Sequence, residues 1–254
     1  MGKIIAIANQ KGGVGKTTTA VNLSASLGLR NKKVLLIDTD PQANATSGVG
    51  VSISEDGLTC YDVLIDDAPM RDAIVKTEFK NLCICPGDMN LAAADIELAG
   101  SDNREFKLKT AIDAVKDEFD FVIIDCPPSL GLITINAFCA SDSVIMPIQC
   151  EYYALEGLSQ LTKTIRRIKK SLNKSLTIEG VLLTMFDKRT NLSVQVVDEV
   201  QKYFSSDAFK TVIPRNVRLS EAPSYGMPVI YYDKNSKGAA CYKKLAAEII
   251  KNNK

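Results

Sequence analysis

Residues 8–23 read ANQKGGVGKTTTAVNL, and they carry the strongest local signal in the sequence. Its GKT at 15–17 completes the usual phosphate-loop pattern of Gly, four residues and Gly-Lys-Ser/Thr. Gln10 stands where the pattern has its first glycine, and an additional lysine, Lys11, follows it. The stretch therefore predicts a phosphate-binding loop that carries one cation more than the pattern requires.

The flanks of the loop predict a strand–loop–helix. An apolar run at 3–8 precedes the loop, and a helix is expected over 16–29. The glycines of the loop let backbone N–H groups turn inward, and the helix N-terminus adds a partial positive charge. We expect Lys16 to reach the β- and γ-phosphates of a nucleotide, Thr17 to ligate Mg²⁺ and Thr18 to donate to the α-phosphate.

Apolar runs alternate with amphipathic stretches almost to the end of the chain. The runs are continuously apolar, which is typical of strands covered on both faces. Helical spacing recurs over 155–172 and 192–203. We expect an α/β fold of the P-loop NTPase type, a doubly wound, mostly parallel sheet with helices on both faces, in a single domain over 1–254. The predicted strands lie at 3–8, 33–38, 82–86, 121–125, 143–148, 178–186 and 210–214.

The composition limits the chemistry. The chain has 254 residues, a net charge of +1 and no histidine, so hydrolysis must rely on carboxylates, lysines, backbone amides and a hard cation. The seven cysteines form no CxxC pair, which predicts reduced core cysteines. With no signal peptide and no apolar run of membrane length, a cytoplasmic protein is expected. Any nucleic-acid binding must come from a local basic patch.

Carboxylates follow two of the predicted strands. Asp125 ends the run FVIID, where a Walker B carboxylate holds Mg²⁺ through water. Asp38 and Asp40 end the run VLLIDTD. A carboxylate near the γ-phosphate can orient the attacking water, and in a chain without histidine Asp40 is the natural candidate.

The segment KGGVGKTTTAVNLSASL resembles the deviant Walker A motif of the ParA/MinD family, a branch of the P-loop NTPases. The likeness runs almost end to end and favours the chromosomal ParA proteins. The segments that carry it are DTDPQANATSG, IIDCPPSLGLITINAF, PIQCEYYALEGLSQL, IEGVLLTMFDKRTNLS and TVIPRNVRLSEAPSYG.

This resemblance implies an ATPase that requires Mg²⁺ and acts as an ATP-dependent homodimer. Lys11 matches the signature lysine, which crosses the two-fold interface to the phosphates of the partner subunit. The implied catalytic residues are Lys11, Lys16 and Asp40, and the implied metal site comprises Thr17, Asp38 and Asp125. The implied ATP-binding residues are Lys11, Gly12, Gly13, Val14, Gly15, Lys16, Thr17 and Thr18, with Pro214 and Asn216 at the adenine.

The resemblance also implies a DNA-partitioning cycle. The ATP-bound dimer binds double-stranded DNA without sequence preference, and a ParB-type centromere-binding protein stimulates hydrolysis and release, so the protein is nucleoid-associated. The family's DNA contacts match Arg189 and Arg218. The basic stretch 166–170, with Lys163 and Lys174, either widens this patch or is a solvated helix face.

A few positions depart from the family pattern. Ala43 stands where the family usually has glycine, which raises a question about the backbone just after Asp40. PGDMNLAAADIEL replaces a more usual PA…LAGAEIEL, and Tyr225 replaces a frequent histidine. These two changes lie outside the predicted phosphate site.

Three other functions of proteins with this loop can be compared with the sequence. A MinD-like membrane-cycling ATPase needs a C-terminal amphipathic helix with large apolar residues, and the end KGAACYKKLAAEIIKNNK does not have that pattern. An electron-transfer protein like the nitrogenase iron protein needs two cysteines per subunit at the dimer axis, and no cysteine pair fits. Metabolic ligases such as dethiobiotin synthetase lack the DNA-contact segments.

Overall fold

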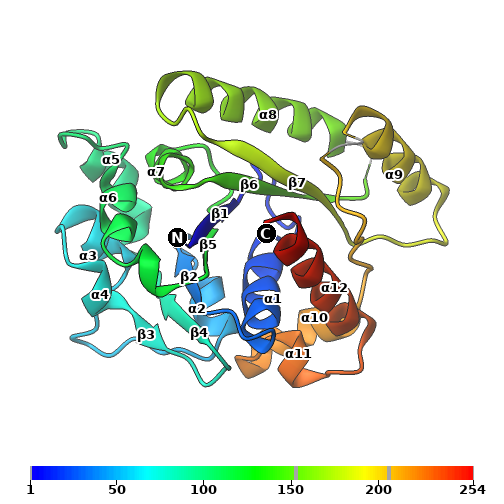
Figure 1. Ribbon diagram of the computed structural model, residues 1–254, viewed down its shortest axis with the longest axis horizontal. Helices are drawn as coiled ribbons and strands as arrows, with labels where there is room; N and C mark the ends of the chain where they lie inside the picture. The colour runs from blue at the N-terminus through cyan, green and yellow to red at the C-terminus, as the bar shows by residue number, and fades with distance from the viewer. Residues whose placement is uncertain (1, 152–153, 205–206, 254) are drawn as a thin grey trace.

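A computed structural model of the chain describes residues 2–151, 154–204 and 207–253. Within them, seven strands form one sheet in the order β3-β4-β2-β5-β1-β6-β7 (Figure 1). Only the edge strand β3 is antiparallel to its neighbour. The strands are β1 (Lys3–Ile7), β2 (Val34–Asp38), β3 (Val75–Lys76), β4 (Leu82–Cys85), β5 (Phe121–Asp125), β6 (Ser143–Gln149) and β7 (Thr177–Thr184).

Helices cover both faces of the sheet, which confirms the predicted fold class (Figure 1). On one face lie α3 (Cys60–Ile65), α4 (Met70–Ala73), α5 (Leu91–Leu98), α6 (Lys107–Asp113), the 3₁₀ turn η1 (Lys116–Glu118), α7 (Leu132–Ala140), α8 (Ala154–Ser171) and α9 (Asn191–Tyr203). On the other lie α1 (Lys16–Leu29), α2 (Asn44–Gly48), α10 (Val217–Glu221), the 3₁₀ turn η2 (Ala222–Tyr225), α11 (Val229–Tyr232) and α12 (Lys237–Asn252).

The central strand β1 explains why the apolar runs lack alternation. Ile4 and Ala6 pack into the core on the α7 side, whereas Ile5 and Ile7 pack into the core on the α1 side. Because both faces of a parallel sheet are buried, every position of such a strand favours an apolar side chain. The predicted helix over 16–29 coincides with α1 and is confirmed.

The predicted strand over 210–214 is wrong. This segment lies along the free edge of β7 but forms only isolated bridges, one of them between Phe186 and Pro214. Ile213 donates from its N–H to the carbonyl of Leu183 at 2.9 Å. The N–H of Arg215 still donates to the carbonyl of Phe186 at 3.0 Å, so hydrogen bonding continues past Pro214. A regular ladder does not form because Met185, directly after β7, has a left-handed φ of 51° that interrupts the extended backbone. The segment instead covers the edge of β7 and carries the chain back to the phosphate loop.

The C-terminal helix α12 is part of the core. Tyr242, Leu245 and Ile249 are fully buried in the cluster that α12 shares with α1. The apolar side of α12 is therefore already occupied by the fold. Among the described residues, no helix has both the length and the apolar character needed to cross a membrane.

Candidate nucleotide-binding site

The phosphate loop connects β1 to α1 with a backbone that requires glycine at two positions. Gly13 and Gly15 have φ angles of 73° and 89°, in the left-handed region that disfavours other residues. Gly15 is the N-cap of α1 and offers no side chain to it. The amide groups of the first helical turn therefore lack intrahelical acceptors and remain available to an anion.

Two polar side chains that sequence reasoning missed anchor this loop. Asn9 donates to the carbonyl of Pro147 at 2.7 Å, and its Oδ1 accepts from the N–H of Lys11 at 3.0 Å. Thr184, at the end of β7, donates to the carbonyl of Val14 at 2.8 Å. Their signal in the sequence is weak, because a single polar residue at the end of an apolar run suits many roles.

The two loop lysines lie in opposite environments. Lys16 is 6% exposed, and its Nζ donates to the backbone carbonyl of Lys11 at 3.3 Å. Burial lowers the pKa of Lys16, while the nearby charges of Asp125 and Asp40 act in the opposite direction. The side chain of Lys11 is 47% exposed, and its Nζ lies 3.0 Å from Oε2 of Glu151. One lysine thus faces the cradle and the other faces outward.

Asp38 and Asp125 lie side by side at the carboxyl ends of β2 and β5, where they are register partners. Asp38 is fully buried, and its carboxylate accepts three hydrogen bonds, from the N–H of Asp40 at 3.2 Å and from the N–H and hydroxyl of Thr46, both at 2.8 Å. Burial raises the pKa of Asp38 to about 6, against the lowering effect of the Thr46 hydrogen bonds. Thr46, which sequence reasoning missed, thus holds Asp38 in place.

Asp125 is equally buried, but neither of its carboxylate oxygens has a hydrogen-bond partner among the described residues. Burial raises the pKa of Asp125 well above its usual range, and the charge of Asp38 adds to this effect, while Thr17 and Lys16 counteract it. A buried carboxylate without a partner is costly and fits a cation or its bound water.

The donor set at this point suits Mg²⁺ held together with a phosphate. Among the described residues, no three His, Cys, Asp or Glu side chains are grouped to hold a metal by themselves. Mg²⁺ commonly takes one or two protein oxygens and completes its shell with water and substrate phosphates. The hydroxyl of Thr17 and the carboxylate of Asp125 offer such oxygens.

Asp40 lies just above these strands and is 7% exposed. Its Oδ1 accepts from the N–H of Gln42 at 3.0 Å. Ala43, three residues on, has a φ of 49°, and this left-handed conformation explains why glycine suits the position. The departure noted in the sequence is therefore a local strain next to Asp40.

The predicted adenine-pocket residues come together with the loop. A cavity of about 270 Å³ is lined by Gly15 and Thr18 on one side and by Pro214 and Asn216 on the other. Oδ1 of Asn216 is buried and has no partner among the described residues, so it can accept a hydrogen bond from a base. A larger cavity, about 590 Å³, lies between α4 and α6 and includes none of the predicted nucleotide residues. Asp67, Asp72 and Asp102 line it, and their negative charges do not suit a triphosphate.

Arg189 and Arg218 are exposed and already have acidic partners. Arg189 binds Asp187, with Nη2 at 2.6 Å from Oδ2. These contacts lower the pKa of Asp187 to about 2. Arg218 binds Glu221 at 2.7 Å and Asp233 at 3.3 Å. The bridge between Phe186 and Pro214 brings the segments of the two arginines side by side.

The strand–loop–helix, the buried lysine and the strand-end carboxylates define a P-loop nucleotide-binding protein with an additional loop lysine. A family model described as an AAA domain matches residues 2–178. The chain is 60% identical over 252 residues to the sporulation initiation inhibitor protein Soj of Bacillus subtilis, covering 99% of this chain and 100% of Soj. It is 53% identical over 251 residues to the chromosome partitioning protein ParA of Myxococcus xanthus, covering 99% and 89%. The chain belongs to the Soj/ParA family of chromosome-partitioning ATPases.

A solved structure extends the likeness to the bound state. It is described as cobyrinic acid a,c-diamide synthase from Mycobacterium smegmatis with a bound ATP analog and magnesium. The TM-score is 0.84 at 33% sequence identity, covering 99% of this chain and 96% of that one. The same fold thus holds an adenine nucleotide with magnesium, although the name of that protein refers to another activity.

Proposed function

We propose that this chain is a DNA-partitioning ATPase that works at the nucleoid in the cytoplasm. ATP and Mg²⁺ join two copies into a dimer that binds double-stranded DNA without sequence preference. A ParB-type centromere-binding protein stimulates hydrolysis, and the separated subunits leave the DNA. The observation that carries this proposal is the opposite placement of the two loop lysines. The lysine that points outward from the phosphate loop is placed to contact the phosphates bound by a second copy of the chain.

Within one subunit, the loop residues bind and polarise the triphosphate. Lys16 neutralises charge on the β- and γ-phosphates, with the loop amides of Gly12 to Thr18 around them. Thr17 and Asp125 hold the metal site, and Asp38 contributes its charge beside Asp125. Mg²⁺, when bound, supplies the neutralisation of developing charge on the phosphate oxygens. Asp40 orients the attacking water.

In the dimer, Lys11 leaves Glu151 and reaches the phosphates bound by the partner subunit. A cation brought to the γ-phosphate from another subunit is worth about 10³–10⁵ in rate in related GTPases. A single subunit should therefore hydrolyse ATP slowly. Pro214 and Asn216 line the adenine pocket, where the free acceptor of Asn216 selects a base that presents a donor.

DNA affinity depends on dimerisation because it depends on the number of cations that act together. Each neutralised phosphate contributes about −0.9 to the slope of log affinity against log salt. With Arg189 and Arg218, one subunit has a slope of about −2 and a dimer about −4. Nucleotide control of dimerisation is thereby control of DNA binding.

Retention of duplex DNA with ATP, with ADP and without nucleotide, each over a salt series, tests the proposal. We expect retention only with ATP, at protein concentrations where light scattering detects a dimer. A single subunit that retained both ATP and duplex DNA at full strength would contradict the proposal.

The membrane-cycling alternative lacks support from the C-terminal helix. The apolar residues of α12 are buried against α1, so they are not free to enter a lipid surface. A flotation assay with liposomes and ATP separates the two functions, since only a membrane-cycling ATPase should float with the lipid.

A further inference from the structure

The basic stretch of α8 forms a stripe on the side of the helix that faces away from the core. Lys163, Arg166, Arg167 and Lys170, called the α8 stripe below, span an arc of about 100° at 3.6 residues per turn. The opposite side of α8 carries the buried Leu158, Leu161, Ile165 and Ile168. The stripe therefore points straight into solvent.

The cations of the α8 stripe have no acidic partners and stand close together, whereas exposed cations without an ion pair elsewhere, such as Lys76 and Lys80 among the described residues, do not form a helical stripe. In the described part of the chain, none of the four is in an ion pair or a side-chain hydrogen bond. The sequence 157–178 contains no Asp or Glu at all. By contrast, ion pairs hold Lys32, Arg71, Arg104, Lys107, Lys109, Lys116, Arg189 and Arg218.

Helix stability does not account for this arrangement. The helix dipole favours cations in the last turn, where Lys169 and Lys170 lie, but its effect does not extend to Lys163 or Arg166. Like charges three or four residues apart, as in Lys163 and Arg167, destabilise a helix. The stripe is thus unfavourable for the free protein and becomes favourable next to a polyanion.

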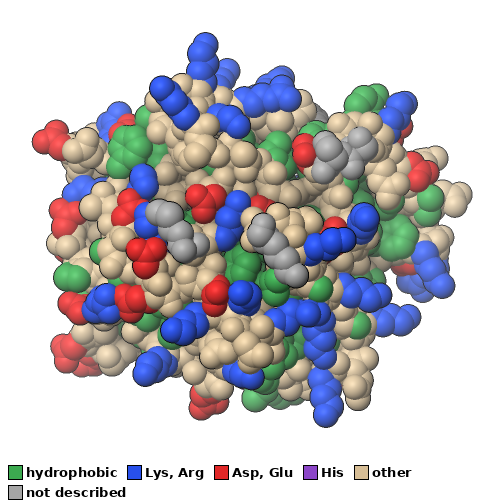
Figure 2. Space-filling view, in the orientation of Figure 1, with side chains coloured by type: hydrophobic (Ala, Val, Ile, Leu, Met, Phe, Trp, Pro, Cys, Tyr) green, Lys and Arg blue, Asp and Glu red, His purple; other side chains and the backbone are tan. Residues whose placement is uncertain are grey.

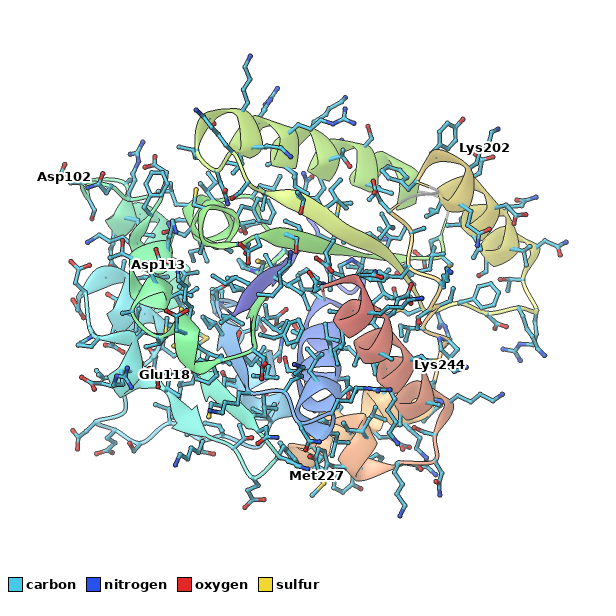
Figure 3. The ribbon with its side chains drawn as sticks, viewed as in Figure 1. Asp102, Asp113, Glu118, Lys202, Met227 and Lys244 are labelled. Carbon is cyan, nitrogen blue, oxygen red and sulfur yellow. The ribbon has the colours of Figure 1, made fainter. Side chains whose placement is uncertain are left out.

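Charge is segregated over the whole molecule. Residues 55–120 contain sixteen Asp and Glu against seven Lys and Arg, whereas 157–254 contain eight against eighteen. Figure 3 shows Asp102, Asp113 and Glu118 on the α4–α6 side and Lys202 and Lys244 on the opposite side. Figure 2 shows Lys and Arg side chains along the rim formed by α8. The net charge of +1 therefore conceals a strongly cationic side.

The stripe itself is about 10 Å long, and together with Lys174 and Arg189 its position matches a longer stretch of DNA backbone. Helix α8 returns from the end of β6 to the start of β7, so the stripe lies along the β7 side of the sheet. Lys174 precedes β7 and Arg189 follows it, and the eight residues of β7 span about 26 Å. At 3.4 Å per base pair this is about eight base pairs. A membrane surface suits the stripe less, because the apolar side of α8 is buried.

We infer that the α8 stripe is a second DNA-contact surface, which binds phosphates of the duplex beyond those held near Arg189. The inference rests on the proposed function, because it assigns more residues to the same DNA-binding activity. It predicts that much of the salt dependence of binding comes from α8, since cations without partners exchange counterions for phosphates directly.

The test compares two double variants with equal changes of charge. Arg166→Glu/Arg167→Glu alters the stripe, and Lys76→Glu/Lys80→Glu alters exposed lysines at β3 and the loop that follows it, on the opposite edge of the sheet. With ATP at 100 mM salt, we expect the first variant to bind duplex DNA at least tenfold more weakly than wild type, with a log–log salt slope reduced by about 2–4. The second should stay within twofold. ATP-dependent dimerisation and DNA-free ATPase activity should be unchanged in both.

Equal DNA affinity and equal salt slope in the two variants would overturn the inference and leave the proposed function intact. If the wild-type ATP dimer did not bind duplex DNA, the proposed function would fail and the inference with it. Stripe-dependent retention by phosphatidylglycerol vesicles, with DNA binding unaffected, would also overturn it. The uncharged pair Lys163→Gln/Lys170→Gln repeats the test should the glutamates disturb the helix, and here too we expect weaker DNA binding.

Discussion

The phosphate site and the surface around Arg189 and Arg218 satisfy their polar groups in opposite ways. At the phosphate site, both oxygens of Asp125 and the Oδ1 of Asn216 are buried without partners among the described residues. On the surface, both arginines already bind carboxylates of their own chain. A ligand at the phosphate site would supply hydrogen bonds or charge to polar atoms that have no partner. A ligand at the arginines would instead replace the carboxylates that they already bind.

This difference bears on affinity and on control. A buried, preorganised site gains the full value of each new interaction, because little water competes there. An exposed arginine that must leave Asp187 or Glu221 gains only the difference between two partners, and salt screens both. On the proposed function, we therefore expect tight nucleotide binding at the first region and weak, additive DNA contacts at the second. That combination would let nucleotide binding control DNA binding.

The largest expected effect comes from Lys16, the one loop cation inside the buried site. Lys16→Ala should abolish ATP binding, and with it DNA binding, because Lys16 is the buried lysine of the described phosphate loop. The measurement is nucleotide binding by equilibrium dialysis. Lys11→Ala is the matched control: it should still bind ATP but lose about 10³-fold or more of its turnover. Normal DNA retention by Lys16→Ala with ATP would contradict the claim that DNA binding depends on nucleotide binding at the phosphate site.

The next effect belongs to the exposed surface. Arg189→Glu with Arg218→Glu should spare ATP-dependent dimerisation but weaken DNA binding by about 100-fold or more, since four phosphate contacts per dimer are lost. The counterpart is Asp187→Asn, which frees Arg189 from its ion pair and should tighten DNA binding a few-fold. A gel-shift titration at fixed salt measures both changes. An unchanged shift for the double arginine variant would move the DNA surface elsewhere.

The sequence predicted the central strands of the sheet and the phosphate loop, but it predicted the edges of the sheet less well. The continuously apolar strands and the GKT of the loop identify a parallel sheet with a phosphate site, because both signals are local and strong. The run at 210–214 resembles a strand in the sequence, yet only isolated bridges form there, because the left-handed Met185 interrupts the extended backbone of the neighbouring chain. Short elements such as β3 and α4 have too few residues to give a periodic signal.

Some residues of the candidate site could be predicted from the sequence, and others could not. The positions of Lys16 and Thr17 at the start of α1 and of Asp125 at the end of β5 were predictable from the motifs, and their roles stay predictions. Thr46 and Glu151 were not predictable, since their roles depend on contacts with residues 8 and 140 positions away in the chain. Ala43 is an intermediate case: its departure from glycine indicated a special backbone, and its left-handed conformation bears this out.

A smaller effect tests whether the unpartnered carboxylate of Asp125 destabilises the nucleotide-free protein. Asp125→Asn removes a buried charge that has no partner among the described residues, so the nucleotide-free protein should gain about 1–2 kcal/mol, or about 2–8 °C in Tm. Because the folded-state pKa of Asp125 is raised, its ionisation lowers the stability progressively as the pH rises above the ordinary carboxyl pKa, and the full cost is present above the raised pKa. The gain should therefore be larger at pH 8 than at pH 5. Differential scanning calorimetry at both values measures it, and a loss of Tm would mean that Asp125 has a stabilising partner.

The smallest effect concerns the one residue that links the two kinds of region. Lys11 belongs to the phosphate loop, yet like the surface arginines it is exposed and paired, with Glu151 at 3.0 Å. An exposed pair is worth about 0.2–1 kcal/mol, and a dimer that uses both copies of Lys11 must break two such pairs. Glu151→Gln should therefore tighten ATP-dependent dimerisation about two- to thirtyfold, measured by sedimentation equilibrium, while ATP binding by the single subunit stays unchanged. A weaker dimer would show instead that Glu151 also supports Lys11 across the interface, and that this lysine is positioned rather than restrained before it reaches its partner.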